Sequence, residues 1–171
     1  TENERLQNQV ERVLDIATLS PNTLNLDKKH IYIHKLLEEV TESLELRLAE
    51  VNGKLYFNFE AQSDITYSDK LHLTNVFTNL IDNAIKYCKQ SPEIKIHTSQ
   101  LNNKIIILIE DNGIGIDKKH YSMIFEKFFR VPSGDKHDVK GFGLGLFYVK
   151  SVLEALDGSI GLIKSDYTGS T

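Results

Sequence analysis

The sequence predicts an α+β fold, a two-layer α/β sandwich in which helices cover one face of a mixed β-sheet. Two observations indicate this fold class. Apolar residues recur at the helical period in some segments, whereas other segments alternate apolar and polar residues as half-buried strands do. These segments also do not follow the strict strand–helix–strand order of a parallel sheet. We therefore expect one domain of ordinary size, preceded by a bundle-forming helix.

The helix at the start of the chain, residues 4–19, is distinct from this domain. Its apolar residues Leu6, Val10, Val13 and Ala17 are spaced four, three and four apart, which is a narrow seam of the bundle or coiled-coil kind. Ser20-Pro21-Asn22 then breaks the helix. Such a seam needs a partner, which is either the chain's own domain or a second chain.

The domain itself begins with a short strand at 30–33 and a helix that ends near Asn52-Gly53. Leu101-Asn102-Asn103 between two strand patterns indicates a β-hairpin. In chain order, the other expected elements are strands at 54–60 and 65–67, a helix at 69–89, strands at 93–100 and 104–110, helices at 117–128 and 144–157, and a strand pair from Ser159.

The composition argues against several classes of function. Twenty basic and 24 acidic residues give a net charge of −4, so we expect no nucleic-acid partner. No apolar run approaches the roughly 20 residues that span a bilayer, and no signal peptide opens the sequence. The single cysteine, Cys88, excludes an internal disulfide, and we expect it to be buried on the apolar side of helix 69–89. The six histidines have no metal-ligand spacing.

Helix 69–89 carries a polar stripe as well as an apolar one. Asn79, Asp82, Asn83 and Lys86 are spaced three, one and three apart, which places them on one face. Asn and Asp in a helix interior cost about half a kcal/mol each relative to Ala, so a solvated face is more easily built from Glu, Lys or Gln. From this stripe alone, a wet surface and a polar binding site both remain open.

Two glycine-rich segments extend the pattern. DNGIGI (111–116) follows an apolar strand, and its glycines permit a tight turn and a close approach to a ligand, although an ordinary β-turn is also open. GFGLGL (141–146) opens helix 144–157 and exposes backbone N–H groups that suit phosphates. It lacks the Lys-Ser/Thr pair of a P-loop. Between them lie the aromatic segment IFEKFFR (124–130) and VPSGDKHDVK (131–140), whose composition is that of a mobile loop and suits a lid.

These four segments, in this order, resemble the motifs of the catalytic and ATP-binding domain of sensor histidine kinases. That domain has the Bergerat-type ATP-binding fold of the gyrase/histidine-kinase ATPase superfamily. Asn79-x-x-Asp82-Asn83-Ala84-x-Lys86-Tyr87 resembles the N box, and DNGIGI the first glycine box. FEKFFR resembles the F box, and GFGLGL the second glycine box. Each motif is weak alone, but the ordered set is specific, and the likeness covers residues 30–171.

The resemblance implies that the chain binds ATP and Mg²⁺. It implies that Asn83 binds the metal, that Asn79 lies beside the metal and phosphates, and that Lys86 neutralises phosphate charge. Asp111 would receive the adenine amino group, with Tyr87 at the edge of the pocket. The other implied contacts are Gly113, Gly115 and Ile116 along the base, Gly141, Gly143, Leu144, Gly145 and Leu146 at the phosphates, Arg130 from the lid, and Ser170 near the adenine.

The implied reaction is transfer of the ATP γ-phosphoryl group to a histidine. Hydrolytic relatives such as gyrase carry Glu at the position of Asn79, and an amide is a poor base. None of the six histidines lies in the family's acceptor motif, so we expect no catalytic residue in this chain and an acceptor outside it. Two alternatives remain, a serine kinase of the anti-sigma-factor type and a nucleotide-binding interaction module without phosphoryl transfer. The bundle-like helix argues against the first, and the intact motifs against the second.

The resemblance also divides the chain. Residues 1–20 are similar to the C-terminal end of a dimerisation helix, and residues 21–171 to the kinase domain, which in the family continues with a further strand. We therefore expect a fragment of a protein that forms a homodimer through the N-terminal helix. Its expected partners are a response regulator and a phosphoacceptor histidine domain. Its expected location is the cytoplasmic part of a membrane-bound bacterial sensor.

Overall fold

A computed structural model describes residues 24–131, 142–166 and 169–171, so the helix predicted at 4–19 lies outside the described residues. The main feature is a five-stranded sheet with the order β2-β4-β5-β7-β6. Its strands are β2 (Lys54–Phe59), β4 (Glu93–Leu101), β5 (Lys104–Asp111), β6 (Ser165–Asp166) and β7 (Gly169–Ser170). β2 runs parallel to β4, and the other neighbouring pairs are antiparallel, so the sheet is mixed.

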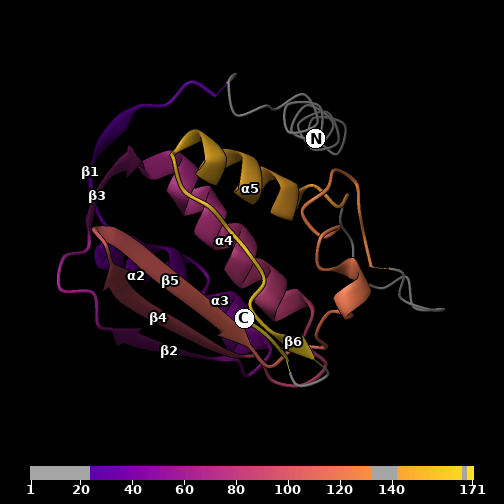
Figure 1. Ribbon diagram of the computed structural model, residues 1–171. Helices are drawn as coiled ribbons and strands as arrows, with labels where there is room; N and C mark the ends of the chain where they lie inside the picture. The colour runs from indigo at the N-terminus through magenta and orange to yellow at the C-terminus, as the bar shows by residue number, and fades with distance from the viewer. Residues whose placement is uncertain (1–23, 132–141, 167–168) are drawn as a thin grey trace, which may run out of the picture.

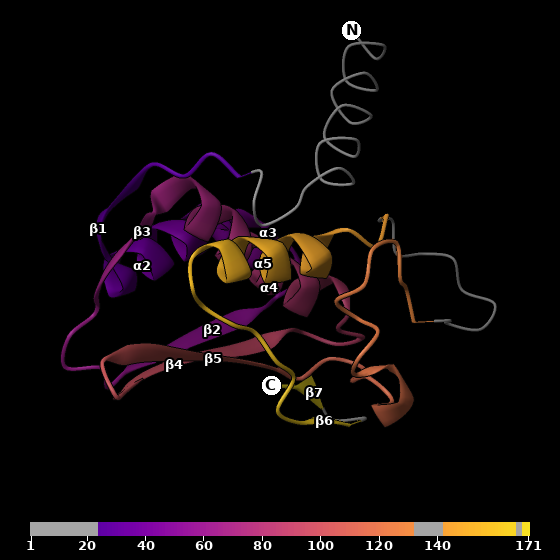
Figure 2. The same cartoon turned by 45° about the horizontal axis from the view of Figure 1, so that its top comes forward.

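Helices form a second layer on one face of this sheet, as Figures 1 and 2 show. They are α2 (Ile33–Ser43), α3 (Glu45–Glu50), α4 (Lys70–Lys86) and α5 (Gly145–Ala155). A small antiparallel pair, β1 (Lys28–Tyr32) and β3 (Ile65–Asp69), leads into α2 and α4. The predicted α+β sandwich is confirmed. Within the described residues, no helix is long and apolar enough to cross a membrane.

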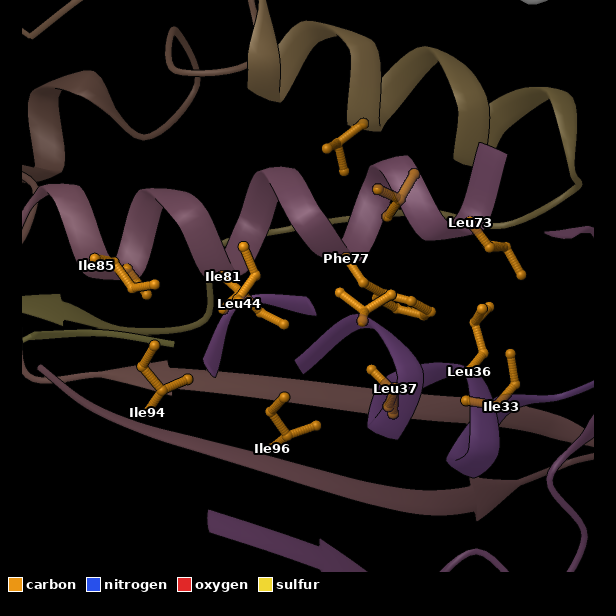
Figure 3. Close-up of a cluster of buried hydrophobic side chains, with 14 of the residues drawn as sticks. Ile33, Leu36, Leu37, Leu44, Leu73, Phe77, Ile81, Ile85, Ile94 and Ile96 are labelled. Atoms are coloured by element: carbon orange, nitrogen blue, oxygen red, sulfur yellow. The ribbon is translucent and has the colours of Figure 1, made fainter. Parts of the chain in front are cut away.

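The core lies between the helices and the inner face of the sheet (Figure 3). Ile94 and Ile96 of β4 are completely buried and point toward α4. The buried residues of α4 follow the helical period and are Leu73, Val76, Phe77, Ile81, Ala84 and Ile85. Burying a large aliphatic or aromatic side chain stabilises the fold by about 1.5–3 kcal/mol, so this face fixes the rotation of α4. The polar stripe of the same helix is thereby turned away from the sheet.

Asp69 starts α4 at a defined point. Its carboxylate accepts hydrogen bonds from the backbone N–H of His72 at 2.9 Å and of Asp27 at 2.7 Å. Burial by itself raises the pKa of Asp69, but these backbone hydrogen bonds outweigh it and hold the pKa below its ordinary value. Asp69 is therefore an N-cap that remains ionised at neutral pH.

The predicted hairpin between β4 and β5 is confirmed. Asn102 and Asn103 have φ angles of 48° and 61°, and the type I′ turn of a two-residue hairpin requires this conformation at both positions. The helix predicted to end near Asn52-Gly53 is interrupted at Leu44 and forms α2 and α3.

Three local predictions are wrong. Residues 117–128 contain a short 3₁₀ helix, Lys118–His120, and further turns in place of a regular α-helix. The final strand pair begins at Ser165 rather than Ser159. Cys88 is half-buried, because α4 ends at Lys86 and the thiol lies beyond the helix, 3.4 Å from Oδ1 of Asn112.

Candidate functional site

The polar stripe of α4 is half-buried rather than open to water. Asn79, Asp82 and Asn83 are partly covered, and only Lys86 is exposed. One carboxylate oxygen of Asp82 forms an ion pair with Arg47 of α3, and the other lies 2.5 Å from Nζ of Lys86. The acid is therefore bound between two cations. Asn79 and Asn83, the two uncharged residues of the stripe, are not part of these ion pairs and are therefore the candidates to contact a ligand.

The two asparagines differ in how they are held. Nδ2 of Asn79 donates to the backbone carbonyl of Asn75 at 2.7 Å, which fixes the orientation of the amide. The Asn83 side chain makes no hydrogen bond to other residues within 24–131, 142–166 and 169–171. Its amide oxygen is thus not occupied by that part of the chain.

The DNGIGI turn docks on the C-terminal end of α4. The backbone N–H of Ile114 donates to the carbonyl of Tyr87 at 2.9 Å. Gly113 lies so close that a Cβ atom there would be 2.8 Å from the same carbonyl and 2.7 Å from Oδ1 of Asp111. Glycine at 113 is therefore required by the approach of this turn to α4. Tyr87 itself is exposed at the margin of the site.

Asp111 is the carboxylate at the centre of this turn. It lies opposite Ile94 in the β4–β5 ladder, so its side chain is on the helix-covered face of the sheet. Burial raises the pKa of Asp111 above its ordinary value, although backbone hydrogen bonds from Gly113 and Ser170 oppose the shift. The Gly113 bond is 2.8 Å long. A desolvated carboxylate with few donors is suited to accept a hydrogen bond from a ligand.

The glycines of the two motifs are needed by the chain itself. Gly115 has a φ of 69°, and a Cβ atom there would lie 1.6 Å from the carbonyl oxygen of Asp166 in β6. Gly143 has a φ of 70°, and its Cβ would lie 2.7 Å from the carbonyl oxygen of Phe129. Both glycines therefore allow close contact between segments that are far apart in the sequence.

The glycine-rich start of α5 meets the polar stripe of α4. A Cβ at Gly145 would lie 2.9 Å from Oδ1 of Asn79, so the Asn79 amide rests against the first turn of α5. Leu144 is buried and forms the N-cap without a side-chain hydrogen bond, and Leu146 is half-buried. The first N–H groups of an α-helix have no partner within the helix and therefore suit an anion. Gly141 lies outside the described residues.

The aromatic segment is joined to α5 by close contacts. The Lys127 ammonium lies 4.7 Å from the centre of the Phe147 ring on α5. Phe128 adopts a φ of 61°, which is unusual for a residue with a side chain, at the point where Gly143 packs. Arg130 follows as an exposed residue.

Ser170 lies beside Asp111 through the sheet, since the two residues pair in the β5–β7 ladder. Its hydroxyl is 2.7 Å from Oγ of Ser165, and that same Oγ accepts from the backbone N–H of Ile116 at 2.7 Å. The Tyr121 hydroxyl donates to the Ser165 carbonyl at 2.6 Å. Sequence reasoning missed Ser165, Tyr121 and Arg47, because their roles depend on contacts between distant segments.

The predicted residues thus form two groups along α4. One group contains Asn79 and the start of α5, and the other contains Tyr87, Asp111 and Ser170. Asn79 and Tyr87 are eight residues apart, a span of about 12 Å at 1.5 Å per residue. Asn83 lies between them. An elongated ligand with an anionic end and a hydrogen-bond donor at the other end fits this arrangement.

Comparison with known proteins defines the class of protein to which this chain belongs. The family model described as "Histidine kinase-, DNA gyrase B-, and HSP90-like ATPase" matches residues 68–171, and the chain belongs to this family. It is a catalytic ATPase domain of the two-component sensor histidine kinase type, and such a domain binds ATP.

Among its relatives, the sensor protein RprX of Bacteroides fragilis is 40% identical over 161 residues, which are 93% of this chain and 31% of RprX. The sensor protein SrrB of Staphylococcus aureus is 32% identical over 93% of this chain and 27% of SrrB. The chain thus spans less than a third of these relatives.

Solved structures confirm the fold. The histidine kinase AdeS of Acinetobacter baumannii matches with a TM-score of 0.74 and 27% identity, over 98% of this chain and 75% of that one. The histidine kinase ThkA in complex with the response regulator TrrA matches with a TM-score of 0.76 over 99% of this chain and 46% of that one. At 21% identity the ThkA likeness shows the fold alone.

Proposed function

We propose that this domain binds Mg·ATP along α4 and transfers the γ-phosphoryl group to a histidine outside residues 1–171. The observation that carries the proposal is the meeting of three motifs on one helix. The Asp111 turn docks at the C-terminal end of α4, and the glycine-rich start of α5 docks at Asn79. The half-buried amide of Asn83 lies between them.

The adenine end of the site is assigned to Asp111. The exocyclic amino group of adenine is a donor, and the desolvated carboxylate is an acceptor on the helix-covered face of the sheet. Tyr87 would lie at the margin of the base. Gly113, Gly115 and Ile116 would form the wall beside it, and Ser170 would adjoin Asp111 from β7.

The phosphate end is assigned to the start of α5. Its first backbone N–H groups, which have no partner within the helix, and the helix dipole favour negative charge. Asn79 is positioned against Gly145 and would contact the phosphates directly. Lys86 and Arg130 would add positive charge, with Gly141, Gly143, Leu144 and Leu146 completing the loop. Binding would draw Lys86 away from Asp82.

The residues present fit Mg²⁺. The described residues contain no cluster of three or more His, Cys, Asp or Glu that could hold a metal alone. Mg²⁺ typically takes one or two protein oxygens and completes its shell with phosphates and water. The Asn83 amide oxygen would be that protein ligand. The ion would neutralise phosphate charge during transfer.

The residues around the γ-phosphoryl favour transfer over hydrolysis. Asn79 is an amide held by Asn75, so it cannot accept a proton from water as a carboxylate would. Catalysis would rest on positioning and charge neutralisation, which is sufficient for phosphoryl transfer. The acceptor histidine would come from a phosphoacceptor domain of the same protein.

The wider context follows from the relatives. ThkA was solved in complex with the response regulator TrrA, which supports a response regulator as the next phosphoryl acceptor here. We place residues 1–20 at the end of a dimerisation helix and residues 21–171 in the kinase domain. The whole protein would be a homodimeric bacterial membrane sensor with this domain in the cytoplasm. Similarity to sensor proteins favours this function over a serine kinase or a non-catalytic module.

Asn83→Ala tests the metal assignment. Calorimetry should show a sharp loss of ATP affinity in Mg²⁺ and a much smaller loss in EDTA, because the missing bond is to the ion. Asn58→Ala, an exposed asparagine on β2, is the matched control and should bind as the unaltered chain does. Equal losses with and without Mg²⁺ would show that Asn83 contacts nucleotide or supports the fold.

The reaction itself is tested in the full-length protein with γ-labelled ATP. We expect label on a histidine that lies outside this domain, and none in the Asn83→Ala variant. Steady release of labelled phosphate without a phosphohistidine would identify a hydrolase instead.

A further inference from the structure

The contact between α4 and α5 contains a polar cluster next to buried apolar residues. Tyr148, in the first turn of α5, is 7% exposed and is followed by the fully buried Val149. Its hydroxyl lies 2.9 Å from Nδ1 of His72 and 3.3 Å from Nδ2 of Asn75. His72 and Asn75 are three residues apart and therefore lie on the same side of α4. The single Tyr148 hydroxyl thus joins the two helices.

The Tyr148 hydroxyl can bond to both of these residues at once. Asn75 donates its amide N–H to the Tyr148 oxygen, and the hydroxyl donates to Nδ1 of His72 in the tautomer that carries its proton on Nε2. Burial raises the pKa of the Tyr148 phenol, so the proton is retained. Loss of the hydroxyl would leave the part-buried Asn75 N–H and His72 Nδ1 without this partner.

The same cluster leads directly to the phosphate end of the site. The backbone carbonyl of Asn75 holds Nδ2 of Asn79, and Oδ1 of Asn79 lies against Gly145. The contacts therefore pair Tyr148 with residues 72 and 75, and Gly145 with residue 79. The two helices run antiparallel here, and Figures 1 and 2 show them side by side.

Two contacts one helical turn apart fix both the distance and the rotation of a helix. We propose that Tyr148, held by His72 and Asn75, is a positioning residue that keeps the glycine-rich start of α5 seated on Asn79 for phosphate binding. The proposal rests on the proposed nucleotide site and names residues outside its motifs. Its consequence is specific: the cluster acts on phosphate contacts and leaves the adenine contacts at Asp111 unaffected.

The test compares the affinities of Mg·ADP and adenosine. Mg·ADP would contact both the adenine end and the phosphate end of the site, whereas adenosine would contact the adenine end alone. Tyr148→Phe retains the ring and removes only the hydroxyl. We expect Mg·ADP affinity to fall about two- to tenfold, as for the loss of one hydrogen-bonded group. Adenosine affinity, measured by competition with a fluorescent ADP, should stay within twofold. Tyr67→Phe, at an exposed position of β3, is the matched control and should change neither affinity.

A second pair of variants keeps the test valid if Tyr148→Phe folds poorly. His72→Asn retains a hydrogen-bonding atom near the position of Nδ1, and His72→Leu removes it. We expect the ratio of ADP to adenosine affinity to fall in His72→Leu and to be largely preserved in His72→Asn.

Equal losses for ADP and adenosine would overturn the proposal, because the cluster would then act through general stability. An unchanged ratio in both Tyr148→Phe and His72→Leu would overturn it as well. Failure of the unaltered chain to bind Mg·ADP would instead refute the proposed function itself.

Discussion

Replacement of Asp111 by Asn separates the contribution of this residue to binding from its contribution to folding. The change preserves shape, and the amide oxygen can still accept from the Gly113 N–H, which lies 2.8 Å from the carboxylate. The altered interaction is the hydrogen bond to the adenine amino group. The Asn NH₂ can turn toward that group, and two donors then face each other without a hydrogen bond. An unmade buried hydrogen bond costs about 1–3 kcal/mol, so ADP affinity should fall by about 5- to 150-fold.

The effect on stability should have the opposite sign. Because burial raises the pKa of Asp111, ionising it costs more in the folded chain than in the unfolded chain. This penalty is absent below the ordinary pKa of Asp and complete above the raised pKa. At pH 7 the Asp111→Asn chain should therefore unfold at the same or a higher temperature than the unaltered one, and its advantage should disappear in acid.

The same pKa shift predicts how binding depends on pH. A nucleotide that donates to the carboxylate favours its ionised form, so the affinity of the unaltered chain should fall as the pH drops through the raised pKa of Asp111. The Asp111→Asn chain should lose this dependence.

Calorimetry with ADP and thermal unfolding, both at several pH values, measure these effects together. Glu110→Gln is the control, since it removes a charge from the neighbouring, exposed position of β5. Unchanged ADP affinity in Asp111→Asn, or a clear loss of its stability at pH 7, would refute the assignment of this carboxylate to the base.

Two further variants test the packing around the site. Gly115→Ala should destabilise the fold by at least about 2 kcal/mol, since a left-handed conformation costs a residue with a Cβ 1–2 kcal/mol and the Cβ meets the Asp166 carbonyl. Gly161→Ala is the control, because a Cβ there has open space, and it should change stability by no more than about 1 kcal/mol in urea unfolding. Similar results for the two glycine variants would contradict the close contact between Gly115 and Asp166. Asp82→Asn should lower the free energy of unfolding by under about 1 kcal/mol, and by less in high salt. The reason is that both cations that pair with Asp82, Lys86 and Arg47, are partly exposed. A larger, salt-independent loss would show that the pair is not screened by solvent.

The elements with a clear periodic pattern could be predicted from sequence. The apolar period of α4 places Phe77 and Ile81 in the core, and this alone turns Asn79 and Asn83 to the other side. The hairpin at Asn102-Asn103 is equally local, because the two turn residues themselves supply the positive φ angles. Local chemistry determines these features, so the sequence reveals them.

The segment 117–128 shows where local patterns fail. Its aromatic spacing is that of a helix, but Phe128 is exposed and has a positive φ where Gly143 packs against it. The Tyr121 hydroxyl is bound to the distant Ser165. Contacts between segments outweigh helix propensity here. The same reason hides Ser165, Arg47 and Tyr148, whose partners lie far along the chain.

The central claim, that α4 and its two glycine turns bind an adenine nucleotide read by Asp111, is tested most directly by titrating Mg·ADP and Mg·GDP into the chain in a calorimeter. Guanine presents a carbonyl acceptor where adenine presents its amino donor, so it would face the carboxylate without a hydrogen bond. We predict binding of Mg·ADP at one site and at least about tenfold weaker binding of Mg·GDP. Equal affinity for the two nucleotides, or no binding of either, would contradict the account.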